Sequence, residues 1–116
     1  MQLGFAVAQR QAVRRFYAQL LGLSLSRLQG GDTLRFIAGA QRVDLVPVED
    51  WRTPTEAPHL AFEVDDLPAL RARLLGDGLA LDEARPLAGH LRFYVRDPAG
   101  NVLEFLQPDA SQAGTL

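Results

Sequence analysis

Residues 59–64 read HLAFEV, and residues 2–7 read QLGFAV. The tripeptide LRF also occurs twice, at residues 34–36 and 91–93, and both pairs are separated by the same 57 positions (59 − 2 and 91 − 34). A unit repeated at this spacing indicates two similar half-sheets. The cleft between two such halves is a natural place for a ligand.

The composition is that of one globular domain. The chain has 116 residues, of which 47% are hydrophobic, and this is enough for one core but not for two independent ones. No apolar run approaches the roughly 20 residues that a membrane-spanning helix needs. The first residues lack the basic segment and long apolar stretch of a signal peptide. We therefore expect a cytoplasmic protein without a membrane partner.

Two residue types are missing, and each absence excludes a class of chemistry. The chain has no cysteine, which excludes disulfides, a thiolate nucleophile and a sulfur-ligated zinc site. All 12 basic residues are arginine, so a lysine Schiff base is excluded as well. The formal net charge is −2 and there is no basic run, which argues against nucleic acid as a partner.

Hydrophobic periodicity predicts the same βαβββ order in both halves. We expect modules at 2–48 and 59–108, joined by the proline-bearing linker 49–58 and followed by a polar tail at 109–116, within one domain over 1–116. In the first module we predict a strand at 2–7, a helix at 11–21 and strands at 23–28, 33–38 and 41–48. In the second we predict a strand at 59–64, a helix at 67–76 capped by Asp65 or Asp66, and strands at 80–84, 90–96 and 101–107.

The alternation within each strand separates two faces of each sheet. One helix covers one face of each half, so the other faces are expected to line a concavity. The apolar stripes predicted to face the helices are Leu3/Phe5/Val7, Leu34/Phe36, Val43/Leu45, Leu60/Phe62/Val64, Leu91/Phe93/Val95 and Leu103/Phe105. The side chains predicted to face the concavity are Gln2, Arg35, Asp44, His59, Arg92, Tyr94, Arg96 and Glu104.

Four of these residues form a candidate metal site. Gln2 and His59 occupy the same place in the two halves, and Asp44 and Glu104 correspond at an offset of 60. Such an oxygen-rich set suits Mn, Ni, Fe, Co, Mg or Zn without choosing among them. For each residue alone, a hydrogen-bonded or solvated strand position is the alternative.

Other residues are candidates for binding a substrate. Arg35 and Arg92, together with Tyr94, have the chemistry to bind a carboxylate or phosphate, and solvated sheet residues are an equally good interpretation. Trp51, in the linker, is interpreted either as a lid over the ligand or as a hydrophobic plug between the halves. His90 is expected in a surface loop.

The segments HLAFEVDDLPALRARL and RFYVRDPAGNVLEFLQP resemble the second half of the vicinal oxygen chelate superfamily, also called the glyoxalase/bleomycin-resistance/dioxygenase family. RRFYAQLLGLSL resembles the family's first helix, and the resemblance covers about residues 2–108. It implies an α+β fold, in which two βαβββ modules form a U-shaped, half-open mixed β-barrel with the helices outside. It also implies a divalent metal held at the positions of Gln2, His59 and Glu104, with Asp44 at a position that some members use.

The resemblance leaves two functions open, with an accessory domain whose cleft is vestigial as a third option. In the first, a divalent metal chelates a small oxygen-bearing substrate and Glu104 or a metal-bound water moves a proton, as in glyoxalase-like lyases and isomerases. Dioxygenase or thiol transferase activity is less favoured. In the second, the protein binds small molecules or drugs without a metal, like the bleomycin-resistance members. A homodimer is expected in either case, because small members of the family usually dimerise.

Overall fold

The computed structural model describes residues 2–26, 32–54 and 60–109. It divides into two compact units, Met1–Ala57 with Asp97–Asn101, and Pro58–Arg96 with Val102–Leu116. The division between the units falls within the predicted linker, and the short connection at 97–101 belongs to the first unit. Within the described residues, no helix is long and apolar enough to cross a membrane.

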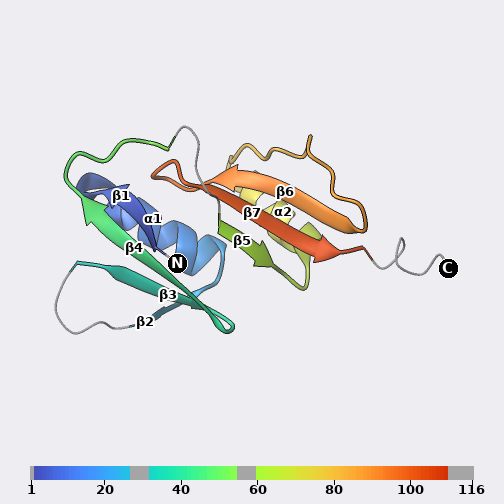
Figure 1. Ribbon diagram of the computed structural model, residues 1–116, viewed down its shortest axis with the longest axis horizontal. Helices are drawn as coiled ribbons and strands as arrows, with labels where there is room; N and C mark the ends of the chain where they lie inside the picture. Colours follow the sequence, from blue (N-terminus) through green and yellow to red (C-terminus); the bar gives the residue numbers. More distant parts are fainter. Residues whose placement is uncertain (1, 27–31, 55–59, 110–116) are drawn as a thin grey trace. The chain divides into compact units, whose positions relative to one another are not determined.

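The first unit contains a four-stranded sheet in the order β1-β4-β3-β2. Its strands are β1 (Gln2–Ala6), β2 (Ser24–Ser26), β3 (Leu34–Ala38) and β4 (Gln41–Val48). β1 and β4 run parallel, and the other pairs are antiparallel. The short 3-10 helix η1 (Val7–Gln9), the α-helix α1 (Arg10–Arg15) and the π-helical turn η2 (Phe16–Leu20) follow one another between β1 and β2. Figure 1 shows this helical segment against one face of the sheet.

The helix of the first unit ends where glycine permits a backbone that other residues avoid. The Leu21 amide donates to the Phe16 carbonyl at 3.0 Å, which closes the wider π-type turn. Gly22 then takes φ +74°, and a side chain there would be strained. The predicted end of this helix at Gly22 is confirmed.

The second unit contains a three-stranded sheet in the order β5-β7-β6. Its elements are β5 (Leu60–Glu63), α2 (Leu67–Gly76), β6 (His90–Arg96) and β7 (Val102–Pro108), and Figure 1 shows α2 against one face of this sheet. Asp66 caps α2, since its carboxylate accepts the Ala69 amide at 3.1 Å. Of the two predicted caps, the structure thus uses Asp66.

The prediction of a strand at 80–84 is wrong, because this segment forms a single isolated bridge. Only Asp82 pairs with β6, through reciprocal backbone hydrogen bonds with Tyr94 at 2.8 and 2.9 Å. The Asp82 carboxylate then accepts the Ala84 amide at 3.0 Å. This local bond takes a donor that a continuing ladder would have used, so the pairing stops after one bridge.

The strand parity is largely correct. Each unit has its own core of buried aromatic and aliphatic side chains beneath its helix. In the first unit the core includes Phe5, Val13, Phe16, Tyr17, Leu34, Phe36, Val43 and Leu45. In the second unit it includes Leu60, Phe62, Leu67, Leu70, Leu74, Phe93, Val95, Leu103 and Phe105. Stacked rings at 5.3–5.4 Å, Tyr17–Phe36 and Phe62–Phe105, connect neighbouring elements within these cores. Burying one such side chain contributes about 1.5–3 kcal/mol.

Four members of the predicted apolar stripes are not in the core: Leu3 and Val64 are half-buried, and Val7 and Leu91 are exposed. Val7 is 56% exposed because η1 begins there and ends the alternation of β1. Leu91 is 41% exposed near the start of β6, where it lines a shallow surface pocket with Leu67 and Pro68 of α2. For these two exposed residues, the predicted burial is wrong.

Candidate functional site

The open face of the first sheet brings three of the predicted site residues side by side. Asp44 on β4 is level with Gln2 on β1 and with Arg35 on β3. All three lie on the face opposite the buried side chains, as the alternation predicts. Gln2 is exposed, and the other two are half-buried.

The Asp44 carboxylate is held by arginine. Arg35 donates from Nε to Oδ1 at 2.7 Å and from Nη2 to Oδ2 at 3.2 Å, a two-bond geometry that suits a guanidinium and a carboxylate. Arg42 Nε lies 3.6 Å from Oδ2. The hydrogen bond from Arg35 is the main reason why the pKa of Asp44 is lowered from its ordinary value.

The Arg35–Asp44 pair gives a testable pH dependence. A carboxyl whose pKa is lowered on folding contributes stability above its unfolded pKa of about 4, and this contribution is lost as pH falls through the lower folded value. We expect Arg35→Gln to destabilise the protein at neutral pH, and the difference from wild type to shrink as pH falls below about 4. Urea unfolding followed by circular dichroism at a series of pH values measures this. A difference that is constant down to pH ~2 contradicts it.

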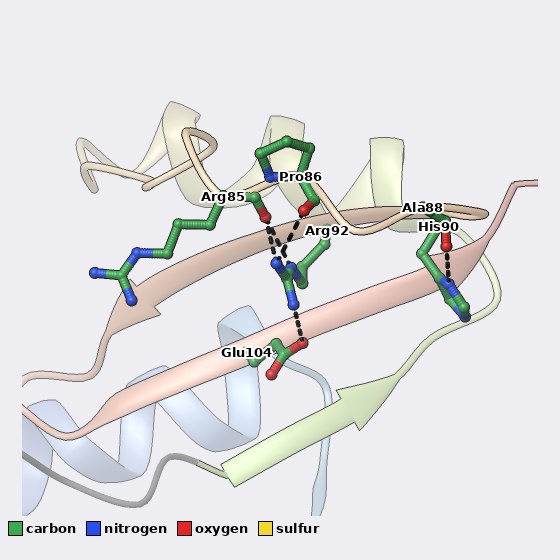
Figure 2. Close-up of polar contacts among 6 residues, drawn as sticks. All are labelled: Arg85, Pro86, Ala88, His90, Arg92 and Glu104. Atoms are coloured by element: carbon green, nitrogen blue, oxygen red, sulfur yellow. Dashed lines mark hydrogen bonds and ion pairs between the residues drawn. The ribbon is translucent and has the colours of Figure 1, made fainter.

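In the second unit, Glu104 is almost fully buried although it lies on the open face. It is 7% exposed, and its neighbours on the adjacent strands are Ala61 and Tyr94. Arg92 covers it, with Nη1 at 3.4 Å from Glu104 Oε2. Figure 2 shows this contact across β6 and β7. The predicted carboxylate is therefore paired with the predicted arginine.

Arg92 also fixes the loop that precedes β6. Its Nε donates to the Arg85 carbonyl at 2.9 Å, and Nη2 donates to the Arg85 and Pro86 carbonyls at 2.5 and 3.3 Å (Figure 2). The guanidinium carbons of Arg85 and Arg92 lie 5.2 and 5.3 Å from the centre of the Tyr94 ring. Arg85 is thus part of this cluster, although nothing in its sequence context indicated a role.

Of the two histidines, the structure describes one, His90. His59, predicted as a metal ligand, lies outside the described residues. His90 is the first residue of β6, and its Nδ1 lies 3.2 Å from the Ala88 carbonyl oxygen. Figure 2 shows it at the far end of β6, turned away from Arg92 and Glu104.

The strand registers shift one predicted correspondence by two residues. Leu3 and Leu60, which match in the repeat, are level with Leu45 and Leu103. By this register, the residue of the second unit that corresponds to Asp44 is Val102. The residue of the first unit that corresponds to Glu104 is Val46. Both carboxylates keep the open face, because a shift of two preserves the side of a strand. The predicted equivalence of Asp44 and Glu104 is therefore not reproduced, and a single site containing both stays a prediction.

Trp51 is anchored within the first unit. Its indole Nε1 donates to the Ala99 carbonyl at 2.8 Å. The ring lies directly on β1, where a Cβ on Gly4 would be 2.3 Å from Cζ3. These contacts hold the indole against its own unit, and closure over a ligand would require breaking them. The predicted plug between the halves stays a prediction. Contact of Trp51 with a substrate stays a prediction.

The DPAGN segment at 97–101 also bonds to the rest of the first unit, at Tyr17 and at Gly4 of β1. The buried Asp97 carboxylate accepts four hydrogen bonds at 2.7–2.9 Å, from the Tyr17 hydroxyl, the Asn101 side chain and the Ala99 and Asn101 amides. Asn101 Nδ2 also donates to the Gly4 carbonyl at 2.8 Å. Burial raises the pKa of Asp97, although all of these bonds act to lower it. Burial also raises the pKa of Tyr17 well above its ordinary value.

The second unit also contains a pocket of about 430 Å³ beside the outer edge of β6. Its walls come from the segment after α2 and from the adjoining ends of β6 and β7. They are formed by Leu79, Ala80, Leu81, Asp82, Arg85, Tyr94, Val95, Arg96 and Val102. Its volume lies within the usual range for small-molecule sites.

With this geometry described, the chain can be compared with known proteins. The model of the family described as "Glyoxalase-like domain" matches residues 2–106. The chain belongs to this family. No curated protein sequence matches it.

Solved structures show the glyoxalase/bleomycin-resistance fold. A glyoxalase/dioxygenase from Nostoc punctiforme has TM-score 0.78 and 22% identity over 93% of this chain and 89% of that one. Lactoylglutathione lyase from Agrobacterium tumefaciens has TM-score 0.69 and 21% identity over 100% and 96%. TnmS3, an antibiotic binding protein from Streptomyces sp. CB03234, has TM-score 0.68 and 28% identity over 93% of both chains.

The described donors fit a divalent metal unequally. Both oxygens of Asp44 accept hydrogen bonds from Arg35, so a cation at Asp44 would compete with a guanidinium for the same carboxylate. Glu104 is engaged by Arg92 through Oε2 and over a longer distance. Of the two carboxylates, each considered within its own unit, Asp44 is therefore the less suitable metal ligand.

Proposed function

We propose that this glyoxalase-like protein binds a small organic molecule and recognises it through arginine side chains, without a resident metal ion. The observation that carries the proposal is the pairing of Arg35 with Asp44 through both carboxylate oxygens. A carboxylate held in this way is a poor metal ligand. It is also a poor general base at neutral pH, because its pKa is lowered.

Two further observations support a binding function. TnmS3, at 28% identity over 93% of this chain, is an antibiotic binding protein, so this fold serves binding in a similar sequence. The second unit also repeats the pairing of an open-face carboxylate with an arginine, at Glu104 and Arg92. In both units the arginine is held against the sheet by its carboxylate.

A metal-dependent lyase or isomerase is the second candidate. Gln2 is level with Asp44 on the open face, and Glu104 is a buried carboxylate beside Arg92 on the open face of the other sheet. In this reading Gln2, His59 and Glu104 hold the metal, which would polarise a substrate carbonyl. Glu104 would then hold or move a proton.

Metal analysis separates the two candidates. We expect wild-type protein, purified without a histidine tag, to carry divalent metal far below one ion per chain by plasma mass spectrometry. Titration with Ni²⁺, Mn²⁺ or Zn²⁺ should give the same weak heat for wild type, Asp44→Asn and the matched surface variant Asp50→Asn. Isomerisation of the hemithioacetal of methylglyoxal and glutathione should stay at the uncatalysed rate.

Stoichiometric metal in the wild type that is lost in Asp44→Asn or in Glu104→Gln, and retained in Asp50→Asn, contradicts the binding proposal. It would establish the second candidate instead. Activity on the hemithioacetal that depends on added Ni²⁺ would do the same.

A further inference from the structure

The pocket beside β6 combines an apolar wall with an excess of positive charge. Leu79, Leu81, Val95 and Val102 supply apolar surface. Two guanidinium groups, of Arg85 and Arg96, oppose one carboxylate, that of Asp82, so the walls carry a net charge of +1. A pocket of this composition favours an organic anion over a neutral or cationic molecule.

The one acidic side chain of the pocket is already engaged. Asp82 Oδ2 lies 3.3 Å from Arg85 Nε, and Oδ1 accepts the Ala84 amide at 3.0 Å. This contact involves the Nε–H of Arg85, which is one of the five N–H donors of its guanidinium group. Asp82 therefore orients Arg85 while leaving the group able to bind a second carboxylate.

Arg85 is held in place from two sides. Its backbone carbonyl accepts two hydrogen bonds from Arg92, and its guanidinium carbon lies 5.2 Å from the centre of the Tyr94 ring. In Figure 2 its side chain extends away from the Arg92 guanidinium. A prearranged cation costs less conformational entropy when it binds an anion than a free surface arginine does.

We propose that this pocket binds a small organic carboxylate, whose apolar part lies against Leu81, Val95 and Val102 and whose carboxylate pairs with Arg85 and Arg96. The inference deepens the proposed binding function and rests on it. It concerns residues of the second unit alone, and it assigns roles to Arg85 and Arg96 that neither the repeat nor the family motifs indicate.

The test uses 2-naphthoate as the probe and 2-naphthalenemethanol as its neutral counterpart, both titrated into the full chain by calorimetry. We expect the carboxylate to bind roughly tenfold or more tightly than the alcohol, as charge-assisted hydrogen bonds to arginine imply. Arg85→Gln combined with Arg96→Gln should remove this preference. The matched double variant Arg14→Gln with Arg52→Gln makes the same change of charge at exposed positions and should retain it.

Equal binding of the two probes to the wild type, or unchanged naphthoate affinity in the Arg85/Arg96 variant, overturns the inference. Raising the salt concentration gives a second measurement, since it should weaken naphthoate binding and leave the alcohol unaffected. Metal content is measured on the same preparations. A metal-loaded protein whose naphthoate binding still depends on Arg85 and Arg96 would overturn the metal-free function while sustaining the pocket.

Discussion

Replacing Asp97 by alanine is expected to lower the free energy of unfolding by at least about 3 kcal/mol. The variant leaves four donors without their acceptor, among them the buried Tyr17 hydroxyl and the Asn101 side chain. Each buried donor left unsatisfied costs about 1–3 kcal/mol. Urea unfolding followed by circular dichroism measures the loss.

Asp50→Ala is the control for this variant, because it removes an exposed carboxylate in the same unit. It should change the free energy of unfolding by no more than about 0.5 kcal/mol. Asp97→Asn retains the shape and one acceptor oxygen, and should fall between the two. Equal stability of Asp97→Ala and Asp50→Ala would refute the structural role assigned to the 97–101 segment.

The second large effect is expected at Gly4. A valine here places Cβ where the Trp51 ring lies, since a Cβ at this position would be 2.3 Å from Cζ3 and 2.8 Å from Cε3. The indole must then leave β1 and lose its hydrogen bond to the Ala99 carbonyl. We expect a loss of about 1–3 kcal/mol, despite the higher strand propensity of valine.

Trp51 is the only tryptophan of the chain, so it reports its own displacement. The emission of Gly4→Val should shift to longer wavelength as the indole enters water. Gly76→Ala is the matched control, because a Cβ at Gly76 meets nothing within 4 Å. An emission maximum that is unchanged in Gly4→Val would show that the indole does not rest on β1.

Much of the fold could be predicted because strands, and the face that each strand buries, are recognisable from short segments of sequence. The alternation around Phe36 and Phe93 determined which face is buried, and the structure agrees. The strand at 80–84 could not be excluded from its sequence. Its pairing ends because the Asp82 side chain bonds to the Ala84 amide, and periodicity does not detect a local bond of this kind.

The sequence predicted which residues face the candidate site, but it did not predict which of them form ion pairs with each other. Parity correctly placed Asp44 and Arg35 on one face, and their direct pairing followed only from the register of β3 and β4. Arg85 was missed because its carbonyl meets Arg92 through a contact across seven residues in an irregular loop. The metal, the homodimer and the contribution of His59 stay predictions.

The first unit depends on the 97–101 segment, which lies far along the chain from the rest of that unit. A fragment ending at residue 57 would lack the only described acceptor for the Tyr17 hydroxyl and the described side-chain donor for the Gly4 carbonyl. Because these two polar groups would lose their partners, we expect such a fragment not to fold by itself. Co-expressed fragments divided within 97–101 should therefore fail to complement each other, whereas fragments divided within 49–54 should still be able to reassociate.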